Sequence, residues 1–281
     1  MKTLYSVYRD AVKQLTEAGC DSPEFDAQQL VQYCFGYNKT GLLMHSGVAV
    51  DEVKLIHFGD CLKKRCDRQP LQYIIGMWDF YKYSIKVGEG VLIPRPETEI
   101  LVEYAIDKIN KKGLKVVFDL CCGSGCIGIS IAKACPQVEV YCIDISDTAL
   151  EYTRKNKELL IADNVKVVKA DILDGTSFIG LPRPDIVLSN PPYIRSDEIA
   201  TLQTEVSFEP RLALDGGEDG LIFYRQLSEI WYPLINRGGY LAMECGEDQA
   251  EDILSLFVGK AEKGNIIKDA SDLDRVVVVS R

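Results

Sequence analysis

The residues whose types and order most clearly suggest chemistry are Asn190-Pro191-Pro192-Tyr193. The apolar run just before them, at 185–189, is typical of a strand, and ligands bind at the carboxyl ends of strands in open α/β sheets. Two prolines fix the backbone and leave carbonyls that only accept, while Asn190 adds a side-chain carbonyl and Tyr193 a flat apolar face. A planar –NH2 group carries two donors, so two fixed acceptors can hold it. We therefore predict Asn190, Pro191 and Tyr193 as catalytic residues that bind an amide or exocyclic amino nitrogen.

A glycine-rich turn follows an earlier apolar run, in the segment 117–128. Gly123 and Gly125 allow a ligand to approach the backbone where a Cβ atom would interfere. Asp144 ends the next apolar run, and a carboxylate there can accept hydrogen bonds from both ribose hydroxyls of an adenosine-containing cofactor. The turn also fits the dinucleotide fingerprint, so a nicotinamide enzyme stays an alternative at this point.

Two further carboxylates bear on the choice of cofactor. Asp119, four residues before Gly123, would repel a pyrophosphate but could pair with the amino group of a methionine moiety. Asp171 follows a third apolar run and could accept from the adenine amino group, although a turn or helix cap explains it equally well. These positions favour S-adenosylmethionine as the cofactor, with an in-line methyl transfer that depends on positioning and on stabilisation of charge on the nitrogen.

Three segments together resemble the HemK/PrmC family, which methylates the glutamine of the Gly-Gly-Gln motif in peptide chain release factors. They are the quartet at 190–193, the segment Val91-Leu92-Ile93-Pro94-Arg95-Pro96-Glu97-Thr98-Glu99 before it and the segment Glu209-Pro210-Arg211-Leu212-Ala213-Leu214-Asp215-Gly216-Gly217 after it. The resemblance covers almost the whole chain, including an N-terminal region that the family is thought to use in docking its protein substrate. It implies methylation of a release-factor glutamine at its N5 amide nitrogen. A ribosomal-protein glutamine, the N6 nitrogen of a nucleic-acid adenine, and an adaptor that binds the cofactor without turnover stay as alternatives.

The resemblance also implies roles for individual residues. Together with the carboxylates above, it gives this cofactor-binding set: Asp119, Cys121, Cys122, Gly123, Ser124, Gly125, Asp144, Asp171 and Asn190. It gives this substrate-binding set: Asn190, Pro191, Pro192, Tyr193 and Arg95. Arg95 and Glu97 could instead form a local ion pair. The family usually has Gly where this chain has Cys121, so the backbone there must suit a Cβ atom.

Composition and charge limit the other functional classes. The chain is 47% hydrophobic and 26% charged, as globular proteins are, and it shows neither an apolar run long enough for a membrane span nor a signal peptide. We therefore expect a cytoplasmic protein without a membrane partner. Residues 1–75 contain nine Lys/Arg and nine Asp/Glu, so the net charge of −10 belongs to the rest of the chain and disfavours stable nucleic-acid binding there. We expect the basic cluster, Lys63-Lys64-Arg65 with Arg68, to be a solvated helix face.

Ten cysteines and two histidines offer potential metal ligands. The cysteines include no Cys-x-x-Cys pair, the close spacing that is common in structural zinc sites. We therefore expect reduced thiols that pack as small hydrophobic groups, and no metal site.

The pattern of elements divides the chain into three parts. Residues 1–72 are expected to form a small helical bundle, with one helix capped by Ser22 and another at about 51–68. Residues 73–95 alternate like strands from Tyr73-Ile74-Ile75 onward and predict a β-hairpin linker. In residues 96–281, strands at 115–120, 138–143, 165–170, 185–189, 240–244 and 275–280 are interspersed with helices at 126–134 and 147–160. With the resemblance, this predicts an α/β fold: a Rossmann-like class I S-adenosylmethionine-dependent methyltransferase domain, a small N-terminal helical bundle and a connecting β-hairpin.

Overall fold

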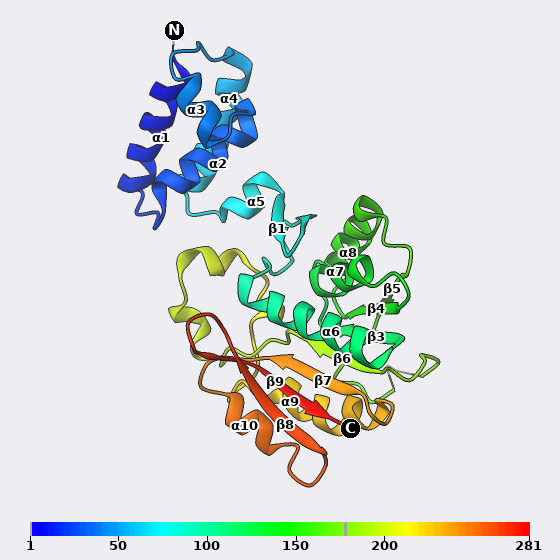
Figure 1. The fold of residues 1–281 in the computed structure, drawn as a ribbon. Coiled ribbons are helices and arrows are strands. Elements are labelled where there is room, and N and C mark those ends of the chain that lie inside the picture. The colour runs from blue at the N-terminus through cyan, green and yellow to red at the C-terminus, as the bar shows by residue number, and fades with distance from the viewer. Residues whose placement is uncertain (1, 177–178) are drawn as a thin grey trace. The chain divides into compact units, whose positions relative to one another are not determined.

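The computed structural model describes residues 2–176 and 179–281, which divide into two compact units (Figure 1). The first unit is Met1–Met77 together with Gln203–Phe208, and the second is Trp78–Leu202 together with Glu209–Arg281. The chain therefore leaves the second unit after Leu202 and returns to it at Glu209. Among the described helices, none is long and apolar enough to cross a membrane.

The first unit is a bundle of short helices whose apolar faces pack together. The helices are α1 (Leu4–Glu17), α2 (Pro23–Phe35), α3 (Lys39–Met44), α4 (Glu52–Cys66) and α5 (Leu71–Ile75). Ser22 stands at the N-cap of α2 as expected, but its side chain makes no capping hydrogen bond. The strand expected at Tyr73-Ile74-Ile75 is wrong, because these residues belong to α5. Pro70 at its start and Gly76, with φ 76°, at its end confine one helical turn that outweighs the strand preference of two isoleucines.

The basic cluster of α4 is not the solvated helix face that the sequence predicted. Lys63 and Lys64 are exposed, but Arg65 is only 6% exposed and its Nε donates to Asp26 at 2.7 Å. Arg65 and Arg68 also donate to Glu205, in the short returning segment of the same unit. The prediction failed because the acidic partners are distant in sequence.

A short hairpin opens the second unit. It pairs β1 (Met77–Phe80) with β2 (Tyr83–Lys86) in a two-stranded sheet. Phe80 and Ile85 are buried in a hydrophobic cluster with residues of the large sheet and its helices, so the hairpin belongs to the core of this unit.

The large sheet has seven strands in the order β5-β4-β3-β6-β7-β9-β8. The strands are β3 (Val116–Leu120), β4 (Glu139–Asp144), β5 (Val165–Lys169), β6 (Ile186–Ser189), β7 (Tyr240–Glu244), β8 (Lys263–Lys268) and β9 (Asp274–Ser280). Neighbours from β5 to β7 pair in parallel, while β9 runs antiparallel to both β7 and β8. The α/β fold predicted from the sequence is confirmed, and β8 is the strand that the sequence analysis missed.

Helices cover both faces of this sheet, as Figure 1 shows. They are α6 (Glu99–Lys112), α7 (Cys126–Ala134), α8 (Asp147–Leu160), α9 (Ile222–Gln226) and α10 (Ala250–Ser255). Short helical turns occur at η1 (Pro96–Thr98), η2 (Ile199–Thr201), η3 (Thr204–Phe208), η4 (Arg211–Ala213), η5 (Leu227–Trp231) and η6 (Tyr232–Leu234). Alternate residues of β3 point to opposite faces, with Val117 in the cluster under α6 and α7 and Phe118 in the cluster under α9 and η5.

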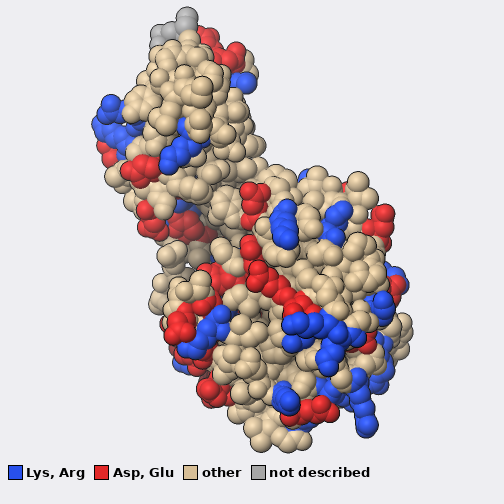
Figure 2. All heavy atoms as spheres, in the orientation of Figure 1, with Lys and Arg blue, Asp and Glu red and all other residues tan. Residues whose placement is uncertain are grey.

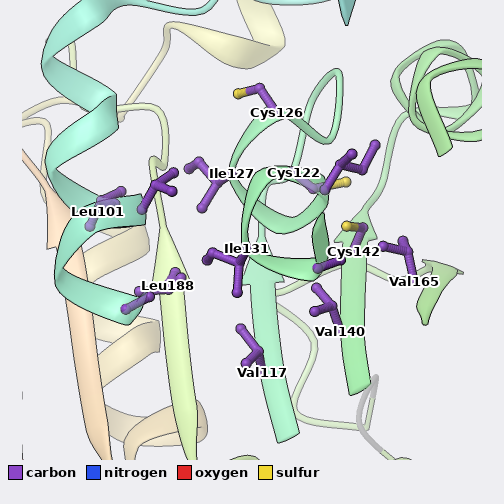
Figure 3. Packing of buried hydrophobic residues seen from close by; sticks show 14 of the residues in the cluster. Leu101, Val117, Cys122, Cys126, Ile127, Ile131, Val140, Cys142, Val165 and Leu188 are labelled. Carbon is purple, nitrogen blue, oxygen red and sulfur yellow. The ribbon is translucent and has the colours of Figure 1, made fainter. Parts of the chain in front are cut away.

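Cysteines contribute to the first of these clusters, shown in Figure 3. Cys122, Cys126 and Cys142 pack there among Ile127, Ile131 and Val140. All ten cysteines are free thiols, and those of this cluster pack as the small hydrophobic groups that the sequence predicted.

Candidate active site

A cavity of about 300 Å³ lies in the second unit, where several parallel strands end. Its wall contains Cys121 after β3, Asp144 at the end of β4, Asp171 after β5 and Asn190 after β6. Parallel strands bring their carboxyl ends to one edge of the sheet, so residues far apart in sequence meet there. This is the place at which the sequence predicted a ligand.

The glycine turn and Asp144 form one side of the cavity. Gly123 has φ 55°, and its amide donates to Asp144 Oδ2 at 2.9 Å, while Ser146 donates to Oδ1 at 2.9 Å. Burial raises the pKa of Asp144, and these backbone hydrogen bonds oppose that rise. Each carboxylate oxygen retains a second lone pair, which suits the acceptance of ribose hydroxyls.

Cys121 occupies the left-handed region of backbone conformation, with φ 58°. A side chain there is strained by roughly 1–2 kcal/mol relative to an ordinary conformation, a strain that glycine would not feel. The sequence required a backbone that suits a Cβ atom, and the turn after β3 meets this only in the small left-handed region, which side chains other than glycine adopt rarely.

Apolar residues that the sequence analysis did not single out form the remaining wall. Ile145 follows Asp144, Ile172 and Leu173 follow Asp171, and Val91 and Phe223 come from more distant segments. Such a slot between apolar side chains suits a flat, largely apolar ring such as adenine. Asp171 lies beside it and its Oδ1 accepts from the Leu173 amide at 2.9 Å, so its role as a turn residue is real. Ile145 and Ile172 directly follow the predicted carboxylates Asp144 and Asp171, and this adjacency could have indicated them from the sequence.

Asp119 lies beneath the glycine turn and does not line the cavity. It is fully buried, and its Oδ2 accepts from the Gly128 amide of α7 at 2.8 Å. Burial raises its pKa to about 7, against the effect of that hydrogen bond. Oδ1 has no hydrogen-bond partner among the described residues. The geometry favours support of the turn over contact with a methionine amino group.

A buried chain of polar groups fixes the side chain of Asn190. Its Nδ2 donates to the Thr98 hydroxyl at 3.2 Å, and the Thr98 hydroxyl is hydrogen-bonded in turn to Glu244. Thr98 and Glu244 are 1% and 2% exposed. A hydroxyl has a single hydrogen, so donation to Glu244 leaves the Thr98 oxygen to accept from Asn190. This hydrogen bond fixes the orientation of the Asn190 amide, with Nδ2 on Thr98 and Oδ1 as its acceptor end. The sequence analysis gave no such supporting role to Thr98 or Glu244.

The segments on either side of the quartet are tied to one another by Glu209. Its Oε2 accepts from the Ile93 amide at 2.9 Å and its Oε1 pairs with Arg95 at 2.5 Å. The alternative in which Arg95 pairs with Glu97 is therefore wrong, because Glu97 is exposed and Arg95 forms its ion pair with Glu209. Arg95 does not line the cavity.

Residues 214–220 hold the quartet in place through backbone hydrogen bonds and close packing. The Ile194 amide donates to the Leu214 carbonyl at 3.0 Å, and the Gly216 amide donates back to the Ile194 carbonyl at 2.8 Å. A Cβ atom on Gly216 would lie 2.8 Å from the Tyr193 Cα, so only glycine allows this approach. Burial raises the pKa of Tyr193 to about 12, so its phenol stays neutral.

The structure thus brings together only part of the predicted residue sets. The predicted residues that line the cavity are Cys121, Gly123, Asp144, Asp171, Asn190 and Pro192. Those that do not are Asp119, Cys122, Ser124, Gly125, Arg95, Pro191 and Tyr193. The side chains of Cys122 and Ser124 are buried under the turn. Gly125 is the N-cap of α7, and a Cβ atom on it would lie 2.8 Å from Thr153.

Comparison with known proteins gives matches along both units. Residues 6–76 match the family described as PrmC N-terminal domain, and residues 97–215 match the methyltransferase small domain. Release factor glutamine methyltransferase from Clostridium acetobutylicum is 38% identical over 259 residues, covering 91% of this chain and 90% of that protein. The protein of the same name from Caulobacter vibrioides is 35% identical, covering 98% of this chain and 96% of its own.

Solved structures show the same fold at low sequence identity. The hMettl16 catalytic domain in complex with MAT2A 3'UTR hairpin 6 is 15% identical, with a TM-score of 0.57, and the match covers 84% of this chain and 85% of that chain. A methyltransferase from Pyrococcus furiosus is 20% identical, with a TM-score of 0.51, over 69% of this chain and 87% of that chain. These likenesses concern the fold alone.

Proposed function

The chain belongs to the release factor glutamine methyltransferase family, and from that premise we propose that it methylates the glutamine of the Gly-Gly-Gln motif of a peptide chain release factor at its N5 amide nitrogen. It is an S-adenosylmethionine-dependent methyltransferase. The observation that carries the proposal is the orientation of Asn190, whose amide is fixed by Thr98 with Oδ1 as the ligand acceptor.

The cavity fits S-adenosylmethionine by shape and by donor set. Asp144 offers carboxylate lone pairs for the ribose, and Ile145, Ile172 and Leu173 offer an apolar slot for adenine. When bound, the cofactor supplies an electrophilic methyl group on its sulfonium. The chain contributes by placing Asn190 in the same cavity wall as these residues.

The chain then contributes to catalysis by positioning the side-chain amide of the substrate glutamine. Asn190 Oδ1 accepts one N–H of the glutamine amide, and we assign the second to the Pro191 carbonyl, as the sequence suggested. The two acceptors would also stabilise the positive charge that develops on the nitrogen while the methyl carbon leaves the sulfonium sulfur, and the nitrogen would then give one of its two protons to solvent. Positioning of this kind can lower the barrier by about 7–11 kcal/mol without any covalent intermediate with the protein.

A protein substrate is favoured over a nucleic acid. The net charge of −10 resides outside residues 1–75, and Figure 2 shows Lys and Arg interspersed with Asp and Glu on the face of the second unit in view. Binding along phosphates depends on clustered basic residues. A release factor acts in translation, so the proposal includes a cytoplasmic location.

A substrate panel tests this proposal. Labelled S-adenosylmethionine is incubated with the chain and, separately, with a release factor, the same factor carrying Gln→Ala in its Gly-Gly-Gln motif, ribosomal proteins and adenine-containing oligonucleotides. Label in the intact release factor alone is the expected result. Label in ribosomal protein or oligonucleotide, with none in the release factor, would transfer the proposal to those substrates.

A further inference from the structure

Three potential metal ligands converge in the first unit, well separated in sequence from the methyltransferase residues. They are Cys34 on α2 and His57 with Cys61 on α4, and their ligand atoms all lie within 4.8 Å of one another. No other group of this kind occurs in the part of the chain that the structure describes. We propose that Cys34, His57 and Cys61 form a binding site for a single Zn²⁺ ion.

The geometry of the two helices explains how the three residues meet. His57 and Cys61 are four residues apart, so both side chains lie on one face of α4. That face packs on α2, which presents Cys34 in its last turn. The Cys61 Sγ and His57 Nε2 are 3.8 Å apart. Zinc lies about 2.3 Å from sulfur and about 2.0 Å from nitrogen, so tetrahedral ligands are separated by roughly 3.5–3.8 Å.

The ligand types and their burial point to a soft divalent ion. Two thiolates and an imidazole are ligands that zinc prefers over oxygen-seeking magnesium or calcium. Cys34 and Cys61 are 8% and 4% exposed, while His57 is exposed at the rim. The ion would therefore have three protein ligands and a water molecule at an open fourth position. The cysteine spacing gave no sign of this, because the ligands come from two helices and not from a Cys-x-x-Cys loop.

Without an ion the thiols stay protonated. An ordinary cysteine thiol has a pKa of about 8.5 and is therefore mostly protonated at neutral pH. Zinc binds the thiolate, so binding must release both thiol protons. Release of two protons per ion therefore distinguishes this site from surface histidine binding.

The test uses the full chain with its cysteines reduced. Titration with Co²⁺ as a spectroscopic substitute should give thiolate-to-cobalt absorption that saturates at one ion per chain, and Zn²⁺ should displace it with release of two protons. Cys34→Ala, Cys61→Ala and His57→Ala should each weaken binding at least about 100-fold, because loss of a ligand exceeds the 10–100-fold typical of residues that only orient ligands. His57 is exposed, so His57→Ala should fold normally, and weaker metal binding by this variant can be ascribed to the lost ligand and not to unfolding.

Matched controls come from the same unit. His45→Ala removes the other histidine of the chain, and Cys66→Ser removes a thiol five residues after Cys61 that is outside the group. Both should bind Co²⁺ like the unchanged chain. Absence of thiolate-to-cobalt absorption in the reduced chain, unchanged binding by His57→Ala, or formation of a Cys34–Cys61 disulfide with no metal uptake after reduction would each overturn the proposal.

Discussion

The side chain of Thr98 controls the orientation of Asn190, and its hydroxyl can be removed with little change in shape. In Thr98→Val, the Asn190 Nδ2 loses its acceptor and Glu244 loses its donor. We expect the rate of methyl transfer to fall about 10–100-fold, equivalent to about 1.4–2.7 kcal/mol, with little change in the KM for S-adenosylmethionine. Single-turnover kinetics measure this.

Thr98→Ser is the matched control because it retains the hydroxyl. It should restore most of the rate lost in Thr98→Val. Equal rates for the valine variant and the unchanged chain would remove Thr98 from the account of the site.

Two buried carboxyls make stability depend on pH. Burial raises the pKa of Asp119 from 3.8 to about 7 and that of Glu244 from 4.5 to about 7. The folded chain therefore binds these protons more tightly than the unfolded chain, so their contribution to stability is complete below about pH 4 and is lost as the pH rises towards 7. For the cofactor-free chain, Glu244→Gln should reduce the pH-dependent change in the free energy of unfolding by roughly 1–3 kcal/mol.

Urea unfolding at pH 5.5 and pH 8 compares the two proteins, and Glu251→Gln on the exposed face of α10 is the control. The unfolding free energy of the glutamine variant should change less between these pH values than that of the unchanged chain. The same change in both would show that Glu244 is ionised in the folded state at both pH values.

The sequence was sufficient to predict the site residues that follow strands, but not the residues that hold those side chains by hydrogen bonds. Asn190 and Asp144 follow apolar runs, so their place at the sheet edge follows from topology alone. Thr98 and Glu244 act through hydrogen bonds between distant segments, and no local pattern encodes such pairs. For the same reason the sequence offered neighbouring Glu97 as an alternative partner for Arg95, whereas the structure pairs Arg95 with Glu209.

At the scale of elements, the close packing of α7 on the sheet depends on Gly128. A Cβ atom there would lie 2.5 Å from the Cys142 Sγ and 3.0 Å from Asp119 Oδ2. Gly128→Ala should therefore lower the unfolding free energy by about 1–3 kcal/mol and weaken cofactor binding, since α7 carries the end of the glycine turn. Denaturant unfolding and cofactor titration measure both effects.

Gly59 on α4 provides a matched control, because a Cβ atom there would meet nothing within 4 Å. Gly59→Ala should stabilise the chain by about 0.5–1 kcal/mol, as alanine does in an open helix position. A stabilising effect of Gly128→Ala as well would contradict the close packing.

Elements buried on both faces were predicted well, and exposed ones poorly. The central strands are continuous apolar runs and were found to within about one residue, as expected for parallel strands covered by helices. Strand β8 was missed because its residues are polar and largely exposed, and its pairing with β9 comes from tertiary contact. Helix α5 was mistaken for a strand because the prediction relied on its two isoleucines and overlooked Pro70 and Gly76, which mark the two ends of a helical turn.

At the scale of the whole molecule, the two units share one chain that crosses between them more than once. Residues 203–208 follow the quartet in sequence but belong to the first unit, where Glu205 accepts from Arg65 and Arg68. Burial opposes ionisation of Glu205, but the hydrogen bonds from Arg68 and Arg65 outweigh it and lower its pKa to about 2. Ion pairs between residues distant in sequence therefore tie this segment to the first unit.

Arg65→Met should destabilise the first unit by about 3–5 kcal/mol, because Asp26 would remain buried without its partner. Hydrogen exchange of α2 and α4 amides in the full chain measures this unit directly. The control is Lys13→Met, in an exposed pair with Glu17, which should leave exchange unchanged. Equal protection in both variants would show that the buried network contributes nothing to the unit.

The central claim is tested most directly by tandem mass spectrometry of a release factor after incubation with the full chain and S-adenosylmethionine, beside the Asn190→Ala variant. We predict one added methyl group on the side-chain amide of the Gly-Gly-Gln glutamine, and its loss in the variant even at a cofactor concentration that saturates the variant. A methyl group on any other atom of the release factor, or undiminished methylation by Asn190→Ala, would contradict the account.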